Sequence, residues 1–424
     1  MRSQSDHFAP SVAFFCPQSK APTEAYLEQL QKYIVETRLL LPFAEAITSL
    51  TDTWTILCDG HPDIAKLKLG KRHVVSLKRW ITDGISGPVS SSMSGILALP
   101  MLVVIQVCQY FQLLELHGLT HERMLANLKK GGGAQGYCGG LPTAFAVSCA
   151  KDEEELVHLA TKALRLAFAV GAFGELGDDE LMEGATTIAV RLRTPPQGDE
   201  LVAGISRVSW NSFRISCKAS PLSVFGPVSR EHGFHPSKPA AFSSSIPVLQ
   251  PYTYNMQCYI SAITDPKTIS IVGPVLELEK VAERARNWGL LVTDIHIRGK
   301  VHNPENAPLV KVLFDICQEH DEMALPDASQ LRVPVRSNLD GSLLHDSSLT
   351  YEAINTILAS RCEWYRLLKD VAKDLAGSGT DAHTFALFGI GDPVPLMPFH
   401  NARLRISKVE AHTTVQEARL AEYK

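Results

Sequence analysis

The sequence lacks any cysteine pattern that would indicate a metal site or a regular set of disulfides. Its nine cysteines are odd in number and scattered along the chain. No C-x-x-C pair and no Cys/His cluster occurs at metal-ligand spacing. We therefore expect the thiols to be reduced and the protein to be cytoplasmic. We also expect no bound metal and no bound cofactor.

A strong charge of either sign is also missing. Charged residues make up 20% of the 424 residues, and the formal net charge is -4. A basic patch that could bind nucleic acid is not expected from this balance, so we exclude DNA and RNA as partners. The apolar content of 45% is typical of a soluble globular protein. The length suits a large domain with a smaller one.

An uninterrupted apolar run is absent too. Residues 1–10 are polar and lack the apolar core of a signal peptide. The most apolar stretch, 95–116, is interrupted by Pro100, Gln106, Gln109 and Gln112. We therefore predict a buried helix at this place and no membrane span.

What the sequence does contain is a nucleophile elbow with cysteine in place of serine. Residues 136–140 read Gly-Tyr-Cys-Gly-Gly. Gly136 and Gly140 would permit a tight strand-to-helix turn, and the dipole of the following helix would favour the Cys138 anion. This arrangement is typical of acyl transfer. The same letters are also compatible with a flexible turn, because three further glycines occupy 131–133.

Strands alternate with helices at both ends of the chain, which predicts an α/β protein. In the first part we expect a strand at 12–15, a helix from Pro22, and helices at 99–117 and 153–173. In the last part we expect a helix at 309–320, a strand at 331–335 and a helix at 350–375. The polar residues beyond 405 resemble a linker or an exposed tail.

Between these parts the pattern changes to that of a smaller unit. We predict a strand at 186–193, a hairpin of 259–263 with 268–272, a helix at 276–288 and a strand at 291–297. This order is ferredoxin-like with one helix missing. Its place is taken by the Pro- and Ser-rich residues 195–251, for which we predict an irregular insert at 194–255; our hypothesis is that part of it is inserted or translated intron sequence. The expected domains are thus 1–185 and 298–405 for the large subdomain, 186–297 for the small one and 406–424 for the tail.

Several separated blocks resemble one family. They are 14–19, the helix with Pro100 and Gln106, 136–140, 269–274, 298–303, 333–341 and 388–389. Their order and spacing resemble the starter-unit acyl-carrier-protein transacylase domain found at the N-terminus of fungal non-reducing polyketide synthases. The resemblance implies a malonyl-transacylase-like fold, in which a ferredoxin-like small subdomain is inserted into an α/β-hydrolase-like large one.

The resemblance also implies roles for individual residues. Cys138 would be the nucleophile of a ping-pong reaction, and His302 the general base that later returns a proton to the leaving thiol. Backbone N–H groups of Gly139 and Gln18 would form the oxyanion hole. A backbone carbonyl near Ile357 would orient the imidazole, so that no Asp is needed.

The expected substrate is an uncharged acyl group carried by CoA or by phosphopantetheine. Malonyl-selective relatives have an arginine on the helix after the elbow, whereas Ala167 stands at that place here and Arg165 is expected to point outward. Ala167 and Phe168 would then line the acyl pocket. The implied partners are an acyl carrier protein domain, an upstream acyl-donor synthase and the remaining domains of a polyketide synthase, beginning with a ketosynthase.

Two alternatives remain at this point. One is a malonyl-type transacylase or a thioester hydrolase on the same fold. The other is a non-catalytic fragment of a polyketide synthase that acts as a docking or structural module, which the Pro- and Ser-rich insert would make credible.

Overall fold

The structure, a computed structural model, describes residues 8–17, 21–67, 70–84, 94–177, 185–191, 258–412 and 414–415. All of these ranges belong to one compact unit, Met1–Pro195 with Cys258–Lys424. The predicted irregular insert at 194–255 lies wholly outside the described residues. So do Gln18 and residues 416–424 of the predicted tail.

A parallel sheet of four strands carries the elbow. The strands are β1 (Val12–Phe15), β2 (Gly133–Gly136), β7 (Ala382–Phe388) and β8 (Arg405–Glu410), in the spatial order β2-β1-β7-β8. Side chains alternate along β1: Val12 and Phe14 join one apolar cluster, and Ala13 and Phe15 join another. Both faces of the sheet are therefore buried, as is usual for parallel strands.

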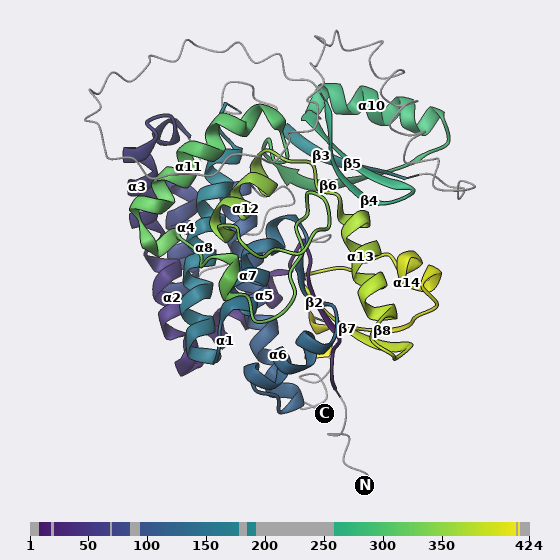
Figure 1. The fold of residues 1–424 in the computed structure, drawn as a ribbon. Helices are drawn as coiled ribbons and strands as arrows, with labels where there is room; N and C mark the ends of the chain where they lie inside the picture. Colours follow the sequence, from purple (N-terminus) through teal and green to yellow (C-terminus); the bar gives the residue numbers. More distant parts are fainter. Residues whose placement is uncertain are drawn as a thin grey trace, which may run out of the picture. The chain divides into compact units, whose positions relative to one another are not determined.

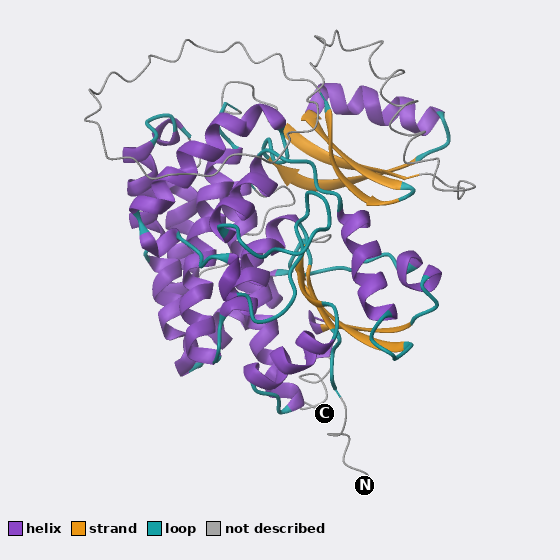
Figure 2. Cartoon of the chain, viewed as in Figure 1, coloured by secondary structure: helices purple, strands orange, loops and turns teal. Residues whose placement is uncertain are grey.

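Helices cover the two faces of this sheet (Figure 1 and Figure 2). Helices α13 (Trp364–Ala376) and α14 (Met397–Asn401) pack on the face of Val12 and Phe14. Helices α1 (Glu24–Glu36), α5 (Gly95–His117) and α7 (Leu141–Cys149) contribute to the cluster on the other face. The same cluster extends to α2 (Leu41–Thr48), α3 (Leu50–Gly60), α4 (Gly70–Asp83), α6 (His121–Lys130), α8 (Glu153–Gly174), α11 (Ala307–Glu319) and α12 (Leu349–Leu358).

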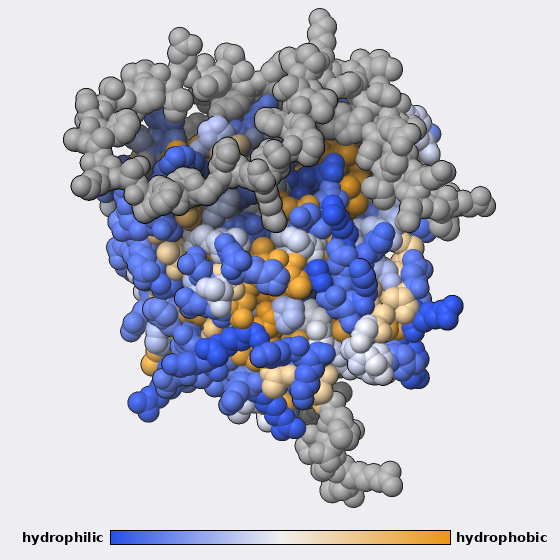
Figure 3. Space-filling view, in the orientation of Figure 1, coloured by the Kyte–Doolittle hydropathy of each residue, from blue (hydrophilic) through white to orange (hydrophobic). Residues whose placement is uncertain are grey.

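Helices α5 and α8 are long and apolar enough to cross a membrane by length and composition alone. Within their most apolar windows, however, 94% and 83% of the residues are buried inside the protein. The two helices pack against each other, and the Asp152 side chain caps the start of α8 by accepting the N–H of Glu155. The buried helix predicted over 95–116 is thus confirmed, and the face seen in Figure 3 is mainly hydrophilic with apolar side chains visible between the polar ones.

The small subdomain is an antiparallel sheet with one described helix on it. Its strands β3 (Ala185–Arg191), β4 (Tyr259–Asp265), β5 (Thr268–Pro274) and β6 (Leu291–Arg298) have the order β4-β5-β3-β6. Helix α10 (Val275–Asn287) packs on β3, β5 and β6. The Asp265 carboxylate closes the β4–β5 hairpin by accepting the Lys267 N–H at 2.7 Å. This strand order is ferredoxin-like, as predicted.

The predicted strand at 331–335 is not formed. Pro334 has no N–H to donate to a ladder, and its carbonyl instead accepts the N–H of Ala134 in β2 at 3.0 Å. The segment therefore runs beside β2 with irregular hydrogen bonding.

Two further predictions need correction. The helix predicted over 350–375 is two helices, α12 and α13, because Cys362 between them pairs with β4: its N–H donates to Ser261 O, and its carbonyl accepts from Ile263 N. The tail predicted from 406 begins as strand β8, which is paired with β7 throughout its length. Its side chains are mostly exposed or half-buried, so its composition resembles that of a linker.

The packing of β1 makes a testable prediction. Phe14→Ala should lower the free energy of unfolding by about 3–5 kcal/mol, because its fully buried ring packs edge to face against Trp364 and Phe385. Leu116→Ala, at a side chain that is 41% exposed, should change it by less than about 0.5 kcal/mol. Urea unfolding of both variants is the measurement; equal losses would contradict this account of the core.

Candidate active site

The elbow forms where β2 ends and passes through one 3-10 turn, Cys138–Gly140, into α7. Cys138 has φ of 51°, a left-handed conformation that side chains rarely adopt. A Cβ on Gly136 would lie 2.5 Å from the Leu141 Cα, and one on Gly140 would lie 2.0 Å from the Phe15 carbonyl oxygen. Both glycines are therefore required for the turn, and a strand of four residues suffices to lead into it.

Cys138 and His302 meet, although they are 164 positions apart in the chain. The distance from Cys138 Sγ to His302 Nε2 is 2.8 Å. His302 follows β6 in a loop and also has a left-handed backbone, with φ of 58°. The imidazole is buried at 4% exposure, whereas Cys138 is half-buried.

Backbone carbonyls orient the imidazole. His302 Nδ1 lies 2.8 Å from both Thr356 O and Ser360 O, so it carries the proton, and Nε2 is left to accept one from the thiol. The predicted carbonyl of Ile357 is used differently: it accepts the backbone N–H of His302 at 2.7 Å. The ring itself is held by the carbonyl of Thr356, one residue before Ile357, and by that of Ser360, three residues after it.

The environment of His302 favours its protonated form. Burial acts against the charge, but the facing Cys138 sulfur and the carbonyls of Ser360 and Thr356 outweigh burial and raise the pKa of His302 above its ordinary value. A base with a raised pKa can hold the proton that it takes from a thiol.

Asn338 is a site residue that the sequence analysis did not single out. Its Oδ1 accepts the N–H of Cys138 at 3.0 Å, and its Nδ2 donates to Gly136 O at 2.7 Å. The side-chain amide thus spans the elbow on both sides of Tyr137. The only sequence signal was its place inside the block 333–341.

The predicted oxyanion donors are only partly described. Gly139 follows Cys138 as the second residue of the 3-10 turn, where N–H groups have no partner within the helix. Gln18 lies outside the described residues. Just before it, Cys16 donates its N–H to Phe388 O, and its carbonyl accepts Gln106 Nε2 at 2.8 Å, so the end of β1 is fixed.

The predicted pocket residues lie on different faces of α8. Gly171 packs against Gly95 of α5, and Ala167, one turn earlier, shares that face. The ring of Phe168 faces α3, 6.3 Å from the ring of Trp54. Both residues are buried, and their part in an acyl pocket stays a prediction.

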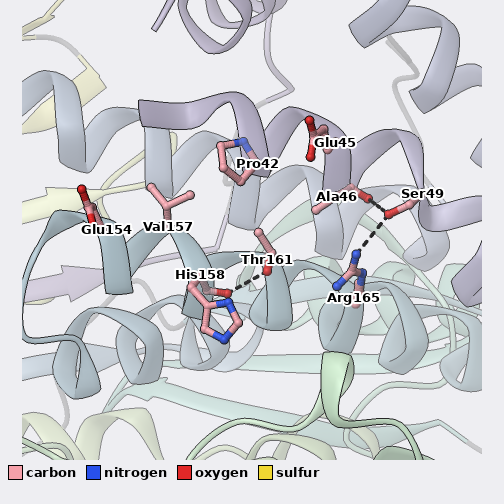
Figure 4. A pocket seen from close by; sticks show the side chains of 9 residues that line it. All are labelled: Pro42, Glu45, Ala46, Ser49, Glu154, Val157, His158, Thr161 and Arg165. Carbon is pink, nitrogen blue, oxygen red and sulfur yellow. Dashed lines mark hydrogen bonds between the residues drawn. The ribbon is translucent and has the colours of Figure 1, made fainter. Parts of the chain in front are cut away.

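Arg165 points away from the Cys138–His302 pair. Its guanidinium donates to Ser49 Oγ at 3.1 Å and lines a surface groove of about 530 Å³ between α2 and the first half of α8 (Figure 4). The loop of His302 contacts the opposite end of α8, where the Lys300 N–H donates to Gly174 O. The outward direction predicted for Arg165 agrees with this placement.

Comparison with known proteins identifies the family. A family model described as starter unit:ACP transacylase in aflatoxin biosynthesis matches residues 62–253. The chain is 44% identical over 407 residues to the non-reducing polyketide synthase atr1 of Stereocaulon alpinum, a match that covers 96% of this chain and 14% of that protein. The chain belongs to the starter unit:ACP transacylase family. This is a family of acyltransferases, as the elbow indicated.

A second relative of this transacylase chain is also a much longer non-reducing polyketide synthase. The non-reducing polyketide synthase pks12 of Talaromyces marneffei is 39% identical over 363 residues, which cover 82% of this chain and 17% of that protein. The chain thus spans only a small part of the length of the polyketide synthases that it matches.

Solved structures agree on the fold. The malonyl CoA-acyl carrier protein transacylase of Coxiella burnetii superposes with a TM-score of 0.51 at 11% identity, over 97% of this chain and 98% of that one. The acyl-carrier-protein-S-malonyltransferase of Bartonella henselae gives 0.50 at 13% identity, over 96% and 98%. The predicted malonyl-transacylase-like α/β fold of the transacylase chain is confirmed.

The close contact at Gly140 gives a prediction for the elbow. Gly140→Ala should lower the melting temperature and slow alkylation of Cys138 by iodoacetamide by up to about 100-fold, because the new methyl group must displace β1 or the turn. Gly377→Ala is the matched control, since Gly377 has φ of -80° and a Cβ there would approach nothing nearer than 3.4 Å. Mass spectrometry of the Cys138 peptide measures the rate; equal rates in the two variants would contradict the assigned elbow geometry.

Proposed function

We propose that this chain loads a starter acyl group onto the phosphopantetheine thiol of an acyl carrier protein by a ping-pong Cys-His mechanism, and so primes polyketide synthesis. The observation that carries the proposal is the 2.8 Å contact between Cys138 Sγ and His302 Nε2, with Nδ1 held by two carbonyls. Membership of the transacylase family supports it.

In the first half-reaction the Cys138 thiol gives its proton to His302 Nε2, and the sulfur attacks the donor thioester. The new S–C bond forms while the carbonyl oxygen becomes an oxyanion, which the N–H of Gly139 would stabilise together with that of Gln18. The Cys138 N–H is already bonded to Asn338, so it is not free for this purpose. When the oxyanion collapses, the bond to the donor sulfur breaks, and the imidazolium returns the proton to the leaving thiol.

In the second half-reaction the carrier thiol replaces the donor. His302 Nε2 accepts its proton, the carrier sulfur attacks the acyl-Cys138 carbonyl, and Cys138 leaves as the thiol after taking the proton back. No cofactor enters these steps. We propose that the donor is an acyl-CoA or an acyl-phosphopantetheine. Among the described residues, no group of three or more His, Cys, Asp or Glu side chains could hold a metal ion.

An uncharged acyl group suits the described surroundings. Arg165 is bonded to Ser49 on the outer side of α8, and Ala167 brings no charge to the face that packs on α5. A malonyl carboxylate would therefore lack the bidentate arginine that normally binds it.

The partners are proposed from the relatives. Because the relatives are much longer polyketide synthases, we propose that the chain acts as one domain of such an enzyme, beside its carrier protein and ketosynthase domains, and that an upstream synthase supplies the acyl group. The eight cysteines in the described part of the chain form no disulfide with one another, which supports a cytoplasmic location.

Acyl transfer from hexanoyl and malonyl donors, followed by intact mass, tests the proposal. Wild type should form a hexanoyl adduct that is passed to a carrier protein, Cys138→Ala should form none, and His302→Ala should form it about 100-fold or more slowly. Arg165→Ala is the control and should leave the rate unchanged.

Other outcomes point to the alternatives. An adduct in Cys138→Ala at the wild-type rate would overturn the nucleophile. Loading of malonate faster than hexanoate would indicate a malonyl-type transacylase. Release of free acid would indicate a thioester hydrolase. The absence of an adduct from either donor would indicate a non-catalytic module.

A further inference from the structure

Glu352 is a buried carboxyl group that the steps above do not use. It lies on α12 with 8% of its surface exposed. One of its oxygens, Oε1, accepts two hydrogen bonds, from Ser337 Oγ at 2.5 Å and from Thr356 Oγ1 at 3.4 Å. These two donors belong to the two segments that hold Cys138 and His302.

The first segment leads to the nucleophile. Ser337 Oγ donates to Glu352 and also accepts the N–H of Leu339 at 3.1 Å, so the two neighbours of Asn338 are joined through one hydroxyl. This fixes the short turn from which the Asn338 amide reaches Gly136 O and the Cys138 N–H. A shift of Ser337 would therefore move the Asn338 amide that bonds to both sides of the elbow.

The second segment leads to the base. Thr356 is one helical turn after Glu352, and its hydroxyl donates back to the Glu352 oxygen. The carbonyl of the same residue accepts from His302 Nδ1 at 2.8 Å. The last turn of α12 therefore sets the direction of the imidazole.

We propose that Glu352 is a positioning residue whose single oxygen, shared by Ser337 and Thr356, fixes the alignment of Cys138 with His302. The proposal rests on the Cys-His pair of the proposed function, but it concerns the reactivity of the thiol and not the identity of the acyl group. It assigns Glu352 no contact with substrate.

Glutamine is a suitable replacement for Glu352. Burial raises the pKa of the Glu352 carboxyl above its ordinary value, against the lowering effect of the hydrogen bonds from Ser337 and Thr356. Glu352→Gln keeps an acceptor oxygen in a side chain of the same length, whereas Glu352→Leu removes the acceptor and keeps the bulk.

Thr350 on the same helix offers a matched control. Its buried hydroxyl accepts the N–H of Leu325 at 2.8 Å, away from the two segments above. The same hydroxyl donates to Leu325 O at 3.3 Å, so Thr350→Val removes two buried hydrogen bonds of α12 and should cost stability of the same order as Glu352→Leu.

The experiment compares alkylation of Cys138 by iodoacetamide, across a range of pH, with the melting temperature of each variant. Glu352→Leu should slow alkylation about tenfold or more and move its pH–rate profile towards that of His302→Ala. Glu352→Gln should restore most of the rate, and Thr350→Val should alkylate as wild type does even where it melts earlier. With an acyl donor that loads wild type, Glu352→Leu should lower kcat and leave KM unchanged.

Two results would overturn the proposal. One is a Glu352→Leu variant that is folded and alkylates at the wild-type rate with the wild-type pH profile. The other is a Thr350→Val variant whose alkylation rate falls in the same proportion to its loss of melting temperature as in Glu352→Leu. Glu352 would then affect Cys138 through stability alone. Because alkylation needs no acyl donor, failure of the proposed acyl transfer would leave this test intact.

Discussion

The site depends on two strained backbone positions that face each other. Cys138 and His302 both have left-handed φ angles, each of which costs on the order of 1–3 kcal/mol and persists only where the surroundings impose it. At Cys138 the constraint comes from close-packed glycines and from the Asn338 amide. At His302 it comes from the end of α12, whose carbonyls accept both the backbone N–H and the ring N–H. The short sulfur–nitrogen contact results from these two separately supported turns.

The small subdomain takes part in this support through β4. Tyr137, next to Cys138, meets Thr264 of β4 at 3.0 Å through their hydroxyls and stacks on the Trp364 ring. The Tyr259 hydroxyl donates to Val301 O, next to the histidine. Residues of β4 thus bond to the neighbours of Cys138 and His302, and a movement of this strand would change the site.

Much of this arrangement could be predicted from the sequence, for physical reasons that differ between residues. The pairing of Cys138 with His302 was inferred because the glycine spacing of the elbow is local and because ordered blocks resembled a family. Asn338 has no such local signal: its partners lie 200 positions earlier, and an isolated asparagine in a loop is common. The break between α12 and α13 was missed because pairing of Cys362 with β4, a tertiary contact, overrides a helical pattern.

The segment from Pro334 to Asn338 covers the outer edge of the strand that leads to Cys138. Strand β2 has a neighbour on one side only, and an open sheet edge is a template on which other chains can aggregate. Here the Pro334 carbonyl accepts the N–H of Ala134. The Asn338 amide donates to Gly136 O and accepts the N–H of Cys138. The edge is thereby blocked by groups that cannot propagate a ladder.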